Sequence, residues 1–202
     1  MSTFLETACS IKHHDPVSLR RTFLFLIRNY YSDPGWFGDV AEPFKKFQYK
    51  DDNTGNIAIR LDWDEDPRSG EDSAVIYVGL GDSVISQRVL DDHEQHSPDL
   101  RDQTHVRVET LPLIVRHRSG SAEEALALGV VTQGFLISAM KQIRPVLGVL
   151  RVGEWTLTRP ALVSQDHPER GYVAELRTEL QFPYAWTIAE ESLRVKNISF
   201  EV

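Results

Sequence analysis

The chain has 202 residues, 41% hydrophobic and 26% charged, a composition typical of one soluble globular domain. Its net charge of −8 argues against a protein whose main task is to grip nucleic acid, because phosphate binding needs a basic surface. Its single cysteine, Cys9, excludes an internal disulfide, and we expect neither a signal segment nor a membrane-spanning run.

The first predicted element is a helix over Pro16–Tyr31. Asp15 is a good N-cap, because its carboxylate can accept hydrogen bonds from the free N–H groups of the first turn, and Pro16 suits the first helical position. The turn sequence Asp33-Pro34-Gly35 ends the helix. Apolar residues repeat between these signals at helical spacing: Leu19, Phe23, Leu24, Ile27 and Tyr31.

Between Phe44 and Leu90 the apolar pattern changes to a period of two residues, which indicates short strands. The predicted strands are Phe44–Tyr49, Ile57–Trp63, Val75–Gly79 and Val84–Leu90. The sequence "GLGDS" (79–83) is interpreted as a hairpin turn. A long strand follows in "THVRVETLPLIVRHR", where Pro112 indicates an edge position or a bulge, because proline cannot donate to a ladder.

A second helix is predicted over Ala122–Arg144, where Ser121 and Glu124 match a capping box. Gly129 and Gly134 each weaken this helix by about 1 kcal/mol. We therefore interpret both glycines as points where another backbone approaches closely.

The remainder is predicted to be β structure: Trp155–Val163, the alternating run "YVAELRTELQFPYAW" and a last strand in "SLRVKNISFEV". The fold class is therefore α+β: one domain over residues 1–202, with a mainly antiparallel β-sheet and two principal helices packed on one face. Extended loops are expected at about 64–73 and 91–104.

Two polar stretches are candidates for metal chemistry. Asp62 and Asp64 would point the same way on a strand, as a metal-dependent hydrolase or nuclease requires, and Glu65 and Asp66 add further oxygen ligands. The turn-rich "DPRSGEDS" favours a solvated loop for this stretch, ahead of a structural cation site, and ahead of a catalytic site. The second stretch could hold zinc but lacks an apolar face to order it, which favours a surface loop; it contains Asp91, Asp92, His93 and His96.

A third set of residues is a candidate protein interface. Arg116 and Arg118, with His117 between them, form a small basic cluster that suits either a solvated strand end or an acidic partner. Exposed aromatic side chains commonly anchor protein contacts, and the aromatic candidates for this role are Trp36, Tyr184 and Trp186.

The order of these elements resembles that of the tail-terminator (tail-completion) proteins of tailed bacteriophages. The resemblance is carried by "VRVETLPLIVRHR" leading into "SAEEALALGVVTQGFLISAMKQI", and then by "WTLTRPALVSQDHPERGYVAELRTELQFPYAWTI". It implies an α+β virion protein of the neck, with no cofactor, no metal and no catalytic residues. Such a subunit forms a ring, hexameric in that family, which caps the tail tube, stops its polymerisation and joins the tail to the head.

The partners implied are copies of the chain itself, the tail tube protein, the head–tail connector and other neck proteins, with a sheath protein as a further candidate. The protein would assemble in the host cytoplasm and reside in the virion, without contact to a membrane. DNA would pass through the ring without specific binding, and an acidic lumen would repel its phosphates. Two alternatives stay open: the metal-dependent hydrolase or nuclease, and another virion subunit of the baseplate or of head completion.

Overall fold

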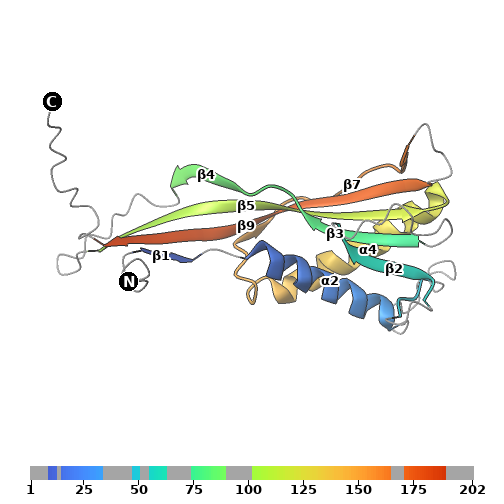
Figure 1. The fold of residues 1–202 in the computed structure, drawn as a ribbon, viewed down its shortest axis with the longest axis horizontal. Coiled ribbons are helices and arrows are strands. Elements are labelled where there is room, and N and C mark those ends of the chain that lie inside the picture. The colour runs from blue at the N-terminus through green and yellow to red at the C-terminus, as the bar shows by residue number, and fades with distance from the viewer. Residues whose placement is uncertain are drawn as a thin grey trace, which may run out of the picture.

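The computed structural model describes residues 9–12, 15–33, 47–50, 55–62, 74–89, 102–164 and 171–189. These ranges form two helices and nine strands (Figure 1). The helices are α2 (Pro16–Ser32) and α4 (Ala122–Ile143). The strands are β1 (Cys9–Lys12), β2 (Ile57–Leu61), β3 (Ala74–Leu80), β4 (Val84–Val89), β5 (Asp102–Ser119), β6 (Arg151–Val152), β7 (Thr156–Leu157), β8 (Ala161–Leu162) and β9 (Tyr172–Ala189).

The sheet is built around β5 and β9, which pair antiparallel over all 18 residues of each strand. On the other side of β5 lie β3 and, farther along, β4. On the other side of β9 lie β1, β6, β7 and β8. These pairs are antiparallel, and the parallel pair of β2 with β3 completes a mainly antiparallel sheet, which confirms the predicted α+β class.

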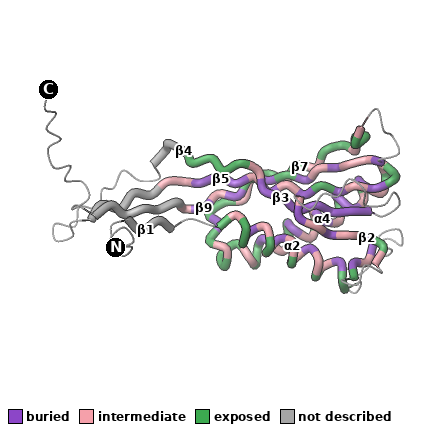
Figure 2. Tube along the Cα trace, in the orientation of Figure 1, coloured by how far each residue is buried: buried purple, intermediate pink, exposed green. Residues whose placement is uncertain are grey.

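Strict alternation along β5 and β9 gives the sheet one apolar face. Odd-numbered residues of β5 from Leu111 to Ser119 and even-numbered residues of β9 from Ala174 to Phe182 are buried. Both helices lie against this face, α2 on β2 and β3 and α4 on β5 and β9 (Figures 1 and 2). The predicted packing of two helices on one face is therefore confirmed.

Both helices begin with the predicted caps. The Asp15 carboxylate accepts hydrogen bonds from the backbone N–H of Val17 at 3.0 Å and of Ser18 at 3.1 Å. The Ser121 hydroxyl accepts one from the N–H of Glu124 at 3.1 Å, while the Glu124 carboxylate accepts one from the Ser119 hydroxyl. Each helix therefore begins where the sequence predicted, at the residue after its cap.

A buried polar network joins the two helices to the sheet. The Thr132 hydroxyl of α4 lies 2.8 Å from the Tyr31 hydroxyl of α2 and 2.9 Å from Nε2 of His117 on β5. It also lies 2.8 Å from the Leu128 carbonyl, and Nδ1 of His117 lies 3.4 Å from the Ala174 carbonyl. All three side chains are fully buried, so these bonds satisfy groups that water cannot reach.

The network sits in an apolar environment that acts on its titratable groups. Burial lowers the pKa of His117 from 6.5 to about 4, so the imidazole is neutral at neutral pH. Burial also raises the pKa of Tyr31, which keeps its hydroxyl protonated. The network is therefore uncharged, and its hydrogen bonds align the two layers without a buried ion.

The β5–β9 ribbon continues past the helices (Figure 1). We call this extension the arm and define it as residues 102–108 of β5 paired with residues 183–189 of β9. β1 borders the arm on the β9 side, and β4 meets its base on the β5 side. The arm is therefore the part of the sheet that extends beyond the two described helices, α2 and α4.

Two expectations about the centre of the chain are corrected. β5 is an internal strand and not an edge strand. Pro112 is tolerated in it because the proline nitrogen faces the Gly81–Ser83 connection between β3 and β4, where no strand needs a donor. On the same side, the Pro112 carbonyl accepts a hydrogen bond from the N–H of Gly81 at 2.8 Å. The "GLGDS" turn does not form a hairpin, because β3 and β4 both pair with β5 and follow one another along the same edge.

Other boundaries differ in smaller ways. Residues 47–50 are not a strand, and Trp155–Val163 forms the separate short strands β7 and β8. The predicted loop 91–104 ends sooner, because β5 already begins at Asp102. Residues 44–46, 63–73, 90–101 and 190–202 lie outside the described residues.

The buried imidazole predicts a specific pH dependence of stability. The unfolded chain protonates His117 near pH 6.5 and the folded chain near pH 4, so the unfolded state binds more protons between these values. The free energy of unfolding should fall by about 3 kcal/mol as the pH drops through this window. Urea denaturation of the wild type and of His117→Gln at a series of pH values measures the free energy of unfolding. In the variant, the decrease of about 3 kcal/mol between pH 6.5 and pH 4 should be absent.

Thr132→Val is the matched control for this experiment. It removes the hydroxyl between Tyr31 and His117 but leaves the imidazole buried, so stability should drop at every pH while the decrease between pH 6.5 and 4 remains. If His117→Gln kept the full decrease, the assignment to this histidine would be wrong.

Candidate interface

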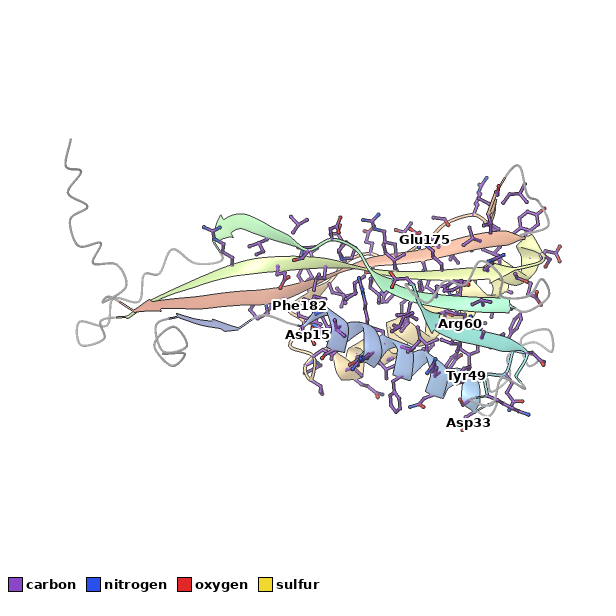
Figure 3. The ribbon with its side chains drawn as sticks, viewed as in Figure 1. Asp15, Asp33, Tyr49, Arg60, Glu175 and Phe182 are labelled. Atoms are coloured by element: carbon purple, nitrogen blue, oxygen red, sulfur yellow. The ribbon has the colours of Figure 1, made fainter. Side chains whose placement is uncertain are left out.

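The predicted basic cluster is divided between the two faces of the sheet. Arg116 and Arg118 lie on the face away from the helices, whereas His117 points into the core and is neutral. The Arg116 guanidinium pairs with the Glu175 carboxylate across β5 and β9 at 3.2 Å, on the face where Figure 3 places Glu175. This pair is largely exposed, so it adds little stability, and the cluster is less basic than the sequence suggested.

The aromatic candidates fall in different parts of the chain. Tyr184 and Trp186 lie on the β9 side of the arm, where Tyr184 is in register with Arg107, and Trp186 with His105 and Ile11. Their side chains, and Trp36 altogether, lie outside the described residues. The two strand positions are thus at the far end of the ribbon from Arg116 and Arg118.

Of the acidic candidates, only Asp62 is among the described residues. Its carboxylate lies against Gly79 of β3, so closely that a Cβ at Gly79 would be 2.3 Å from Oδ2, and Oδ1 is buried without a hydrogen-bond partner. Within the described ranges, no group of three or more His, Cys, Asp or Glu side chains could hold a metal ion. Asp64, Glu65, Asp66 and the Asp91–His96 stretch lie outside these ranges.

Beside the helices, parts of both sheet edges are bound by groups of the same chain. Arg28 of α2 donates from Nε and Nη2 to the Ile59 carbonyl of β2, at 3.2 and 2.8 Å, and its guanidinium stacks 5.2 Å from the centre of the Tyr49 ring. On the opposite edge, β9 is covered by β6, β7 and β8. Edge pairing with another chain is therefore disfavoured at these points beside the helices.

The outer face of α4 is an apolar surface that the described residues leave uncovered. α4 has no charged residue from Ala125 to Met140, and Leu126, Val130 and Ile137 are 40%, 51% and 40% exposed. Most soluble helices carry charges on such a face, so this one is suited to a partner.

A groove of about 490 Å³ lies beside this face, between α2 and α4. The Tyr30 ring of α2 stacks on Phe135 of α4 at 4.1 Å and forms its floor. Apolar atoms dominate the lining, with amide and hydroxyl groups among them. The residues around the groove are Leu26, Asn29, Tyr30, Gly134, Phe135, Ser138, Ala139, Gln142 and Ile143.

The two helical glycines differ in their surroundings. A Cβ at Gly129 would lie 2.6 Å from Cδ1 of Leu157 on β7, so this glycine allows the β7 segment to pack on α4. A Cβ at Gly134 would meet nothing within 4 Å. The neighbour of Gly129 is thus a side chain and not a backbone, and among the described residues none comes within 4 Å of a Cβ at Gly134.

α4 also has the length and composition of a membrane-crossing helix, a property that the sequence analysis did not expect. A core helix of a soluble protein passes the same test, and α4 packs one side on β5 and β9 and holds Thr132 in the buried network. Its apolar residues therefore have two roles, because one set forms the core and the other faces outward.

Comparison with models of known protein families and with curated protein sequences finds no match. The assignment of this surface therefore rests on the geometry of the chain itself. Sequence reasoning missed it, because the helical pattern was used only to find the buried stripe. The absence of charge over Ala125–Met140 was the signal that could have identified it.

The contrast between the glycines gives a prediction. Gly134→Ala should raise the free energy of unfolding by about 1 kcal/mol, because alanine is the better helix former and no atom obstructs its methyl group. Gly129→Ala should show no such gain, since its methyl group must displace Leu157. Urea denaturation of both variants at low protein concentration measures the difference; equal stabilisation would contradict the packing of β7 on α4.

Proposed function

We propose that this protein is a structural subunit without enzymatic activity, which forms a ring in the neck of a tailed bacteriophage. The ring, of six copies as the resemblance implies, caps the tail tube, stops its growth and joins it to the head. The observation that carries this proposal is the arm, which extends the central ribbon beyond the helices that cover the rest of the sheet (Figure 1).

An arm of this form suits contact with a neighbouring copy. Narrow β ribbons gain stability when they pack against further structure, and neither of the two described helices, α2 and α4, covers the arm in Figure 1. A contact between the arm of one copy and the body of the next is heterologous, which is the kind that closes into a ring. Tyr184 and Trp186 place aromatic residues in the arm, and such residues often anchor interfaces.

The closed edges beside the helices support the same interpretation. Because Arg28 binds the β2 edge and β6–β8 cover the β9 edge, the parts of the described chain most suited to a partner are the arm and the outer helical face. The net charge of −8 suits a channel for DNA, since a negative wall repels phosphate and lets the duplex move.

The proposal predicts that the purified protein forms a discrete closed oligomer that binds the ends of tail tubes. Light scattering gives the mass, and electron microscopy of tubes assembled with and without the protein shows capping and tube length. We expect rings on tube ends and shorter tubes when the protein is present. A protein that stays monomeric and leaves tube growth unchanged would contradict the proposal.

The arm can be tested separately in the same assays. The double variant Tyr184→Ala, Trp186→Ala should lose ring formation while its far-ultraviolet circular dichroism stays that of the wild type. Leu162→Ala is the matched control, since it removes an exposed apolar side chain at the opposite end of the same ribbon, where Leu162 pairs with Tyr172. Ring formation that survives the double variant would exclude the arm as the subunit contact.

A further inference from the structure

The exposed face of α4 is symmetric about the level of Thr132. Thr132 marks the buried side of the helix, and Glu123 and Lys141 stand nine residues before and after it on the opposite side. Between them lie residues that form pairs at equal distance from Thr132; all are exposed except Ala127, which is half-buried and packs against the core. These pairs are Val130 with Gly134, Ala127 with Ile137, and Leu126 with Ser138.

We propose that this face binds the same face of a second copy, with the two α4 helices packed antiparallel about a two-fold axis at the level of Thr132. Antiparallel packing brings each residue to the level of its counterpart in the other copy. Glu123 of each copy then faces Lys141 of the other, so that an acid meets a base at both ends. In a parallel arrangement the two glutamates would meet, as would the two lysines.

The centre of this contact has matched shapes. Near the axis, Val130 of each copy lies over Gly134 of the other, and no atom of the described residues lies within 4 Å of the position that a Gly134 Cβ would take. Farther out, Leu126 of one copy meets Ile137 of the other on the same side of the interface. The contact therefore buries the most exposed apolar residues of α4 and explains an exposed glycine in the middle of a helix, which otherwise only weakens it.

This contact goes beyond the proposed ring and does not rest on it. A two-fold contact is isologous and joins two copies, whereas a ring closes through heterologous contacts. It would pair two free subunits, or join two rings face to face. The arm has no part in it, so the two interfaces can be disrupted independently.

Charge exchange at the ends of α4 tests the geometry. Glu123→Lys and Lys141→Glu should each raise the dissociation constant of the pair about tenfold, because each places two like-charge pairs across the interface. A mixture of the two single variants should associate with wild-type affinity, since every Lys then faces a Glu. Analytical ultracentrifugation measures both; a mixture as weak as the single variants would overturn the antiparallel two-fold contact.

Substitutions at the centre test the surface without risk to the fold. Val130→Asp should abolish pairing, whereas Val146→Asp should not, although Val146 is 86% exposed in the turn after α4. Gly134→Leu should also abolish pairing, while its thermal unfolding temperature should not fall, because space surrounds Gly134 in the single chain.

Three results would overturn the proposal: a wild type that remains unpaired through α4 at every concentration, pairing unaffected by Val130→Asp and Gly134→Leu, or binding of this face to phosphatidylcholine vesicles in a flotation assay. If rings form but Gly134→Leu leaves their mass unchanged, the two-fold contact is contradicted and the proposed ring is not. If the Tyr184→Ala, Trp186→Ala variant no longer forms rings but still pairs through α4, the two-fold contact is supported independently of the ring.

Discussion

The continuous pairing of β5 with β9 is the constraint on which the rest of the structure depends. Eighteen residues of each strand pair without a change of register, so alternate side chains of both strands face the helices over the whole covered length. A shift of β5 by one residue would move Leu113 to solvent and Arg116 into the core. The same pairing extends past the helices, and it therefore builds both the floor of the core and the arm.

The buried network then determines where the two helices lie on that floor. Apolar packing alone tolerates small displacements, whereas Tyr31, Thr132 and His117 have to meet within hydrogen-bond distance or leave polar groups buried without partners. The network also orients α4, because Thr132 points toward the sheet and so directs Val130 and Gly134 outward. The position of the exposed apolar face thus follows from a bond made inside the core.

The sequence correctly predicted the features that depend on residues close together in the chain. Asp15 and Ser121 located both helix starts, and the alternation after Tyr172 identified β9, because caps and periodicity depend on neighbours in the chain. Pairing partners were not predictable in this way: the turn at Gly81 connects two strands that both pair with β5, and Pro112 fits an internal strand only because that turn lies beside it. The basic cluster around Arg116 was predicted to include His117, but His117 is buried in the core. The sequence could not show this, because which face of a strand is buried depends on the elements that cover it.

The central claim is that copies of the chain associate through the arm and the outer face of α4, and that the β2 edge takes no part in this association. Hydrogen–deuterium exchange of the full chain, compared between dilute and concentrated solutions, tests it most directly. We expect slower exchange on association in peptides from residues 102–108 and 183–189 and from α4, with no change in β2, whose Ile59 carbonyl already binds Arg28. Exchange that is independent of concentration everywhere, or protection confined to residues 57–61, would contradict it.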